Sequence, residues 1–214
     1  MKQPQQLACV CMCLLLFAAQ SLSAQETPER AWSLSLLGSL GAAKLSVDEP
    51  NAQLTSSYRQ AFSLGAQLER RLTNRWGVSV GAIRSLRGTN SSAIAENDPF
   101  PGVEIRTLYS ELQLLTHFQL AATPAVRIDA LAGPVLSWSG GGDVFLRSTG
   151  QPVGVVDLKP TEASLLVGAQ ARFTWRVPLF VRLQYQGGLT DATVGGPARS
   201  QAFSGVVGLT IFRW

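Results

Sequence analysis

Cysteine and histidine are nearly absent from this chain of 214 residues. Its three cysteines, Cys9, Cys11 and Cys13, all lie in one apolar stretch near the start, and His117 is its single histidine. If that stretch is a removable leader, the rest of the chain has no thiol, which excludes disulfides and cysteine-based metal sites. One histidine alone is a poor metal site. We therefore expect neither a metal nor a cofactor.

Charged residues are also scarce. Only 15% of the residues are charged, and of the 18 basic residues three are lysines. The surface of a soluble domain is usually about 25–35% charged. The basic residues form no cluster, which excludes nucleic acid as a partner. No apolar run after residue 24 has the roughly 20 residues of a transmembrane helix, so a membrane-spanning form would have to be a β-barrel.

The first 24 residues are typical of a cleaved secretory signal peptide. Lys2 supplies a positive charge, residues 7–19 form an apolar stretch too short to span a bilayer, and Ala24 is the small residue at the expected cleavage site. A lipoprotein would need a cysteine just after the stretch, and none is there. The sequence therefore predicts a signal peptide at 1–24 and one exported domain at 25–214.

After the leader, apolar and polar residues alternate with a period of two, which is typical of β-strands with one apolar face. Short polar or proline-containing turns alternate with long connections, as in outer-membrane barrels with short periplasmic turns and long external loops. We expect a bulge at Pro134, because proline cannot donate to a strand ladder. The predicted strands are 31–45, 58–72, 76–88, 104–120, 125–139, 163–176, 179–190 and 201–214.

The pattern predicts an all-β fold: a closed, eight-stranded, antiparallel up-and-down transmembrane β-barrel in the outer membrane. Its apolar face meets lipid, and its polar face fills the interior. The alternative is a soluble, secreted, lipocalin-like barrel. An eight-stranded barrel has room inside only for its own side chains, so we expect no open pore. Buried charges there must pair. The expected lumen network is Glu69, Arg71, Arg87, Glu111, Arg127, Asp129, Arg172 and Arg182.

Two further groups are expected to face the lipid. Five tryptophans fall at predicted strand ends, where aromatic girdles form at the membrane interfaces: Trp32, Trp76, Trp138, Trp175 and Trp214. Arg84 and Arg106 share the lipid-facing parity of adjacent strands near the external rim, and are candidate contacts for lipopolysaccharide phosphates. The alternatives for both are snorkelling to the interface, or a bulge that turns them inward.

Three segments carry a family resemblance. The run YSELQLLTHF (109–118) resembles a strand of the PorT-like outer-membrane β-barrel proteins of Bacteroidota, with Gln113 where that family usually has proline. Residues 64–88 and 130–138 resemble the second hairpin and fifth strand of the same family. The alternating aromatics Phe212 and Trp214 resemble the C-termini of barrels that the outer-membrane assembly machinery recognises. The resemblance implies a small outer-membrane barrel of Gram-negative bacteria, and recognition by that machinery.

No catalytic motif is evident. Thr116, Phe118 and Gln119 beside His117 offer no serine nucleophile, and Ser110 has the opposite parity. The glycine runs 140–142 and 195–196 lack the lysine of a phosphate-binding loop. We therefore do not expect an enzyme. Three functions stay open: a structural or adhesive protein whose external loops contact a partner protein, an accessory of a transport or secretion assembly, and a narrow channel.

Overall fold

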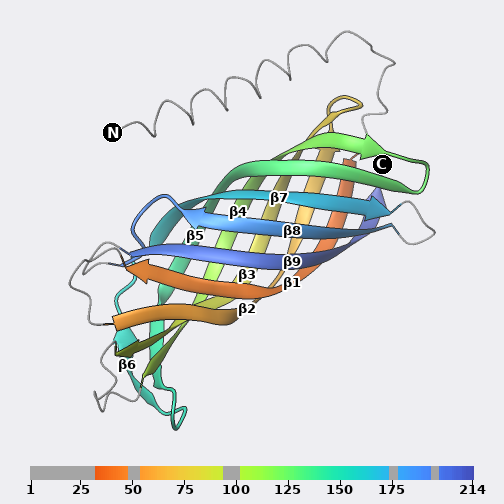
Figure 1. Ribbon diagram of the computed structural model, residues 1–214. Coiled ribbons are helices and arrows are strands. Elements are labelled where there is room, and N and C mark those ends of the chain that lie inside the picture. The colour runs from red at the N-terminus through yellow and green to blue at the C-terminus, as the bar shows by residue number, and fades with distance from the viewer. Residues whose placement is uncertain (1–31, 48–53, 94–101, 174–177, 194–197) are drawn as a thin grey trace, which may run out of the picture.

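The structure is a computed structural model that describes residues 32–47, 54–93, 102–173, 178–193 and 198–214. The predicted signal peptide, residues 1–24, lies outside the described residues. The described part contains nine strands (Figure 1). They are β1 (Trp32–Val47), β2 (Leu54–Arg71), β3 (Trp76–Ala93), β4 (Val103–Ala122), β5 (Val126–Leu146), β6 (Pro152–Val156), β7 (Thr161–Phe173), β8 (Leu179–Gly188) and β9 (Ala198–Arg213).

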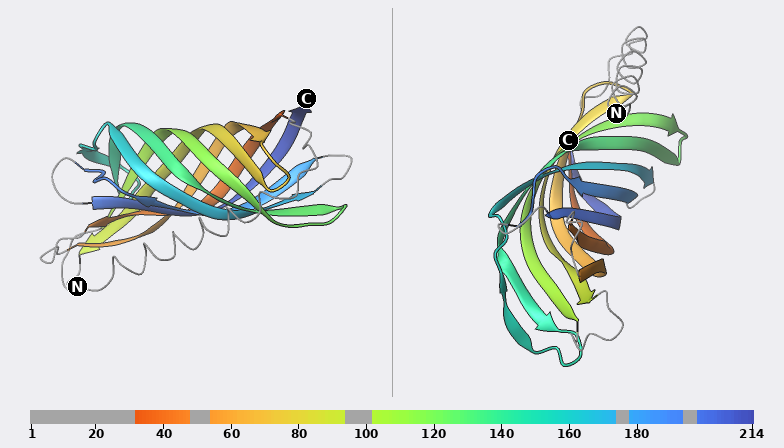
Figure 2. Two further views of the ribbon diagram at one scale, coloured as in Figure 1. Left: turned by 90° about the horizontal axis from the view of Figure 1, so that it is seen from above. Right: turned by 60° about the vertical axis from the view of Figure 1, so that its left-hand side comes forward.

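Eight of these strands form a ring. Each strand pairs antiparallel with its neighbour in the order β1, β2, β3, β4, β5, β7, β8, β9, and β9 pairs with β1. Backbone hydrogen bonds between Trp32 and Trp214, of 2.6 and 3.0 Å, join the two ends of the described chain. The strands run obliquely around the axis of the ring (Figure 2). The predicted antiparallel up-and-down architecture is confirmed.

The two ends of the ring differ. One, the turn end, carries the short connections after β2 and β4 together with Trp32 and Trp214. The other, the loop end, carries the longer connections and β6 (Figure 1). Side chains alternate outward and inward as predicted: Leu36 and Leu40 are exposed, whereas Ser35 and Ser39 are buried. No helix in the described ranges has the length and hydropathy to cross a bilayer.

Two expectations about the strands are wrong. Strands β2, β3 and β5 extend well into segments predicted as loops, and β6 lies inside the predicted loop 140–162. Pro134 causes no bulge: it lies opposite Leu165 in an unbroken register, and the β4–β5 register is the same on both sides of it. Gly133 beside it lets β4 approach closely, since a Cβ there would lie 1.9 Å from the carbonyl oxygen of Leu114.

The interior is less uniformly polar than the alternation suggested. Apolar side chains point inward where two apolar residues adjoin in sequence, because one of the two must face the lumen. They form two buried clusters: Leu37, Ile83, Phe180 and Val206; and Leu115, Leu131, Val135 and Leu166. Layers of apolar side chains therefore separate the polar groups inside the ring.

Phe180 is fully buried and lies against Gly208 on β9, where a Cβ would meet its ring at 2.0 Å. We predict that Gly208→Ala lowers the free energy of unfolding by about 1–3 kcal/mol, the usual cost of overpacking a filled interior. Gly205→Ala on the same strand is the matched control, because the nearest atom to its Cβ would lie at 3.8 Å. Urea titration in detergent micelles measures both. Equal stabilities of the two variants would contradict the packing described.

Candidate functional site

The turn end of the lumen holds a network of ion pairs around two carboxylates. Glu69 on β2 accepts hydrogen bonds from Arg172 and, at 3.4 Å, from Arg127. Asp129 on β5 pairs with Arg127 at 2.9 Å and with Arg71 at 3.7 Å. Strands β2, β5 and β7 thus place these five side chains together, although they are far apart in sequence. Both carboxylates are almost completely buried, so they depend on these arginines for charge compensation.

Deeper in the lumen, Arg182 makes no ion pair among the described residues and is held by amides instead. Its guanidinium donates to Gln170 Oε1 at 2.8 Å and to Gln67 Oε1 at 2.6 Å. The ring of Phe180 lies 5.3 Å from the guanidinium carbon. The alternation places both glutamines on the inward face of their strands, but neither was among the residues expected in the lumen network. The buried charge of Arg182 is therefore compensated by hydrogen bonds to amide oxygens and by an aromatic face rather than by a carboxylate.

His117 has a partner that the sequence search missed. Ser79 Oγ lies 2.8 Å from His117 Nε2, on the neighbouring strand β3 rather than on β4. The sequence neighbours of His117 show nothing of this contact, because residues across a β-ladder are as close as residues along one strand. Both side chains are buried, and His117 Nδ1 has no hydrogen-bond partner in the described part of the chain. The pair thus lacks a third group to orient the imidazole.

The loop end of the lumen holds a separate, smaller network. Arg87 forms an ion pair with Glu111 and donates to Gln186 Oε1 at 2.7 Å. Glu162 accepts a hydrogen bond from Ser200. Arg87, Glu111 and Gln186 border a small cavity inside the ring. The eight residues expected as one lumen network therefore all point inward, but they do not form one network: five meet at the turn end, Arg87 and Glu111 pair here, and Arg182 is held by amides between them.

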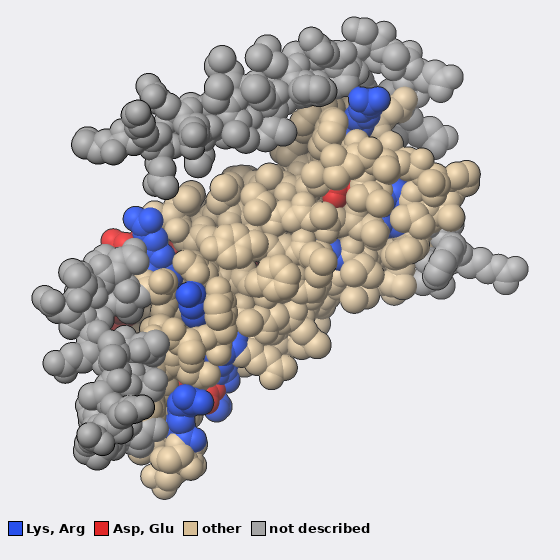
Figure 3. All heavy atoms as spheres, viewed as in Figure 1, with Lys and Arg blue, Asp and Glu red and all other residues tan. Residues whose placement is uncertain are grey.

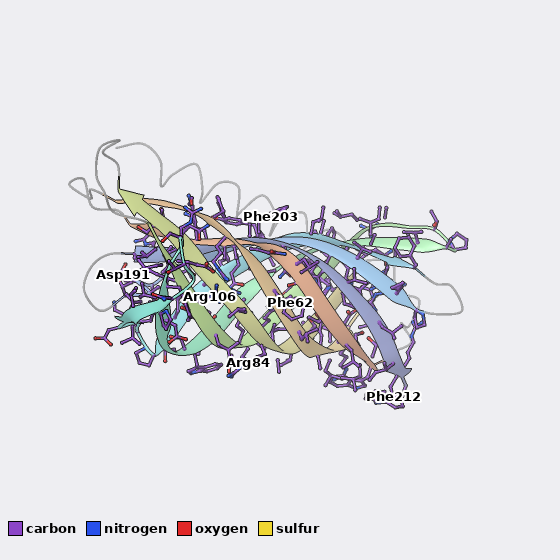
Figure 4. All side chains as sticks on the ribbon, turned by 90° about the horizontal axis from the view of Figure 1, so that it is seen from below. Phe62, Arg84, Arg106, Asp191, Phe203 and Phe212 are labelled. Atoms are coloured by element: carbon purple, nitrogen blue, oxygen red, sulfur yellow. The ribbon has the colours of Figure 1, made fainter. Side chains whose placement is uncertain are left out.

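Above this network, apolar residues close the loop end. Leu45 on β1, Leu158 after β6 and Ala192 after β8 form a buried cluster. The connection after β6 is fixed to the one after β8, since Lys159 N donates to Ala192 O at 2.8 Å and Lys159 lies 3.8 Å from Asp191. Two connections thus lie across the mouth of the ring at the end where Asp191 is seen in Figure 4.

The two candidate lipid-facing arginines differ in their surroundings. Arg106 pairs with Glu104 at 2.8 Å, and its guanidinium lies over the ring of Phe145 at 4.3 Å. Arg84 makes one hydrogen bond within the described chain, to Ser110, and projects from the outer wall (Figure 4). It lies in an open groove whose lining includes Leu64, Ala82, Leu112 and Trp138. Arg84 and Arg106 are four residues apart along the β3–β4 ladder, which is about 13 Å of extended chain, so they do not form one site.

The aromatic residues at the ring's ends face outward. Trp32 begins β1, Trp76 begins β3 and Trp214 follows β9, all at the turn end, whereas Trp138 lies on β5 where its pairing with β7 ends. The ring of Trp76 packs against that of Phe118 in a tilted arrangement, with the ring centroids 4.8 Å apart. Trp175 lies outside the described residues. A broad band across the middle of the visible wall shows no charged side chains, and most of the blue and red atoms lie toward its two ends (Figure 3). The outer surface thus has the polarity of a membrane-embedded wall.

A family model described as "Outer membrane protein beta-barrel domain" matches residues 18–194. The chain belongs to this family. As an outer-membrane barrel, it has its turn end in the periplasm and its loop end outside the cell. The predicted outer-membrane location is confirmed, and the lipocalin-like alternative is excluded by the same match.

Solved structures with a similar fold are outer-membrane proteins of low sequence identity. Ail, the attachment invasion locus protein of Yersinia pestis, is 16% identical, with 87% of this chain and 100% of that chain covered and a TM-score of 0.46. Neisserial surface protein A is 15% identical, with 86% and 100% covered and a TM-score of 0.46. OprG from Pseudomonas aeruginosa is 9% identical, with 85% and 93% covered and a TM-score of 0.46. Among curated proteins none matches.

The ion-pair network around Glu69 and Asp129, at the turn end and so on the periplasmic side, contributes to the stability of the barrel in a way that can be measured. Glu69→Gln leaves Arg127 and Arg172 short of a buried countercharge, so we predict a loss of about 3–5 kcal/mol in the free energy of unfolding. Asp191→Asn is the control, because its pair with Lys159 is about 40% exposed and should contribute about 0–1 kcal/mol. Tryptophan fluorescence during urea unfolding in micelles compares the two. Similar small losses would show that Glu69 is not the centre of the network.

Proposed function

We propose that this protein is a closed, non-conducting barrel that presents a protein-binding surface outside the cell. The observation that carries the proposal is the way the wall continues past the ring on one side. Strand β5 pairs with β7 only as far as Trp138, yet it runs on to Leu146. That distance is about 25 Å of extended chain. A structure of this size beyond the membrane needs a role outside it.

The extension is a sheet, which we call the external sheet: residues 54–58, 89–93, 103–106, 142–146 and 152–156, contributed by β2 to β6 in order. Strand β6 lies at its edge in the sheet order. Val153 and Val155 on β6 are exposed, Val155 to 77%. A sheet edge with exposed apolar side chains is suited to pair with an extended segment of another protein. We therefore assign the binding surface to β6.

The closed lumen supports a non-conducting barrel. Paired arginines fill the periplasmic half, apolar clusters occupy the middle, and Leu45, Leu158 and Ala192 cover the external mouth. A solute would have to displace several buried ion pairs to pass. The same burial argues against catalysis: Ser79 and His117 are within hydrogen-bond distance, but they lie where a substrate has no access.

Two finer assignments belong to the same proposal. The C-terminal strand β9 presents Phe212 and Trp214 on its outer side, both more than 60% exposed, which suits recognition by the assembly machinery. Membership of the PorT-like proteins stays a prediction from the resemblance of residues 109–118. The role as an accessory of a larger assembly has no observation of its own in its favour.

Val155→Asp tests the external sheet. We predict that cells displaying this variant bind at least about tenfold less to plates coated with extracellular-matrix proteins, because a carboxylate at β6 opposes apolar contact. Ser148→Asp is the control, since it adds the same charge to the exposed turn before β6 and removes no apolar surface. Equal adhesion of both variants and the unmodified protein would contradict the assignment to β6. Single-channel steps from the purified protein in planar bilayers would contradict the closed lumen.

Arg84 is proposed to contact a lipopolysaccharide phosphate from its groove in the outer wall. We predict that Arg84→Gln reduces the lipopolysaccharide that co-purifies with the protein, because its guanidinium has no carboxylate partner in the described chain. Arg106→Gln should change little, since Glu104 already pairs with Arg106. Phosphate assay of detergent-purified samples compares them. If the lipopolysaccharide content is unchanged both in Arg84→Gln and in the variant that combines it with Arg106→Gln, the proposed contact is wrong.

A further inference from the structure

Arginines outnumber carboxylates in the periplasmic half of the lumen. Four of them point inward there, and they share two carboxylates among the described residues. Burying a charge without a countercharge is costly. The half-lumen thus holds two more positive than negative charges. The residues concerned are Arg71, Arg127, Arg172 and Arg182, with Glu69 and Asp129.

The positions of these arginines make the surplus more costly. Arg127 and Arg172 lie directly opposite each other in the β5–β7 ladder, where like charges destabilise a sheet. Arg71 is close enough to both to be repelled by them. The two carboxylates reduce this repulsion but are too few to remove it. An additional negative charge among the three guanidinium groups would lower the energy of the folded barrel.

Hydrogen-bond donors without acceptors mark the same place. Arg71 Nη1 and Arg172 Nε are buried and have no partner in the described part of the protein. Gln170, which is 1% exposed, also has an unpartnered Nε2. Buried donors of this kind are rarely left unmatched. The side chains of Arg71, Arg127 and Arg172 stay 12–16% exposed, so this cluster can be reached from the periplasmic end.

We propose that the periplasmic mouth of the lumen is an oxyanion site, formed by Arg71, Arg127 and Arg172, that takes a phosphate or carboxylate group. Guanidinium forks match such groups with paired hydrogen bonds. The oxyanion supplies the missing acceptors and the missing negative charge together. It can come from two sources: a soluble anion of the periplasm, or the carboxylates of Glu26 and Glu29, which precede β1 in the sequence by a few residues.

Calorimetric titration of inorganic phosphate tests the site, using protein purified from outer membranes at constant ionic strength. Arg71→Gln should weaken phosphate binding about tenfold or more, the usual effect of losing a hydrogen bond to a charged group. Arg70→Gln is the matched control: it removes the same charge one residue away, but Arg70 lies on the outer side over the ring of Trp32, at 5.0 Å. Equal weakening in both variants would overturn the proposal.

A second variant separates the two sources. If Glu26 and Glu29 occupy the site, phosphate binds only after Glu26→Gln and Glu29→Gln are combined; if the anion is soluble, the unmodified protein binds it as well. Either result supports the site. Thermal unfolding gives a measurement that needs no arginine variant, since a bound anion raises the midpoint relative to chloride. Absence of phosphate binding and of a midpoint shift in both proteins would overturn the proposal.

Discussion

Closure of the backbone ladder is the constraint on which the rest of this structure depends. In the hydrocarbon of a membrane, a peptide N–H or C=O without a partner costs several kcal/mol, so a sheet edge cannot face lipid. The pairing of β1 with β9 removes both edges within the ring. Trp32 and Trp214 complete it through the hydrogen bonds of their main chains. The first and last strands must therefore meet before the wall is stable in lipid.

Closure also decides what the side chains do. With a period of two, each outward leucine places its neighbour inside, where little water remains to solvate charge. The arginines of the interior are held by carboxylates near the periplasm and by amides deeper in. Outside the membrane the same wall can be open at its edges, because water satisfies the free groups. The external sheet therefore has an open edge at β6, whereas the part of the wall in lipid has none.

Much of the fold was predictable because alternation is a local signal. The exposed faces of β3, β4 and β7 follow from parity alone, as does the inward position of Glu69 and Arg182. Side-chain contacts between strands were not predictable in this way, because the partners are far apart in sequence. Ser79 is 38 residues from His117 in sequence, and only the ladder shows that they meet. The length of β5 beyond Trp138 was also missed, because its glycine-rich continuation has the composition of a loop.

The buried charges are not spread evenly along the axis of the barrel. The periplasmic half carries the surplus of arginines, whereas the external half sets Arg87 against the two acids Glu111 and Glu162. This separation gives the lumen a permanent electric dipole parallel to the membrane normal. Its field adds to whatever potential exists across the outer membrane. The filled barrel therefore acts as a polarised wall rather than as inert packing.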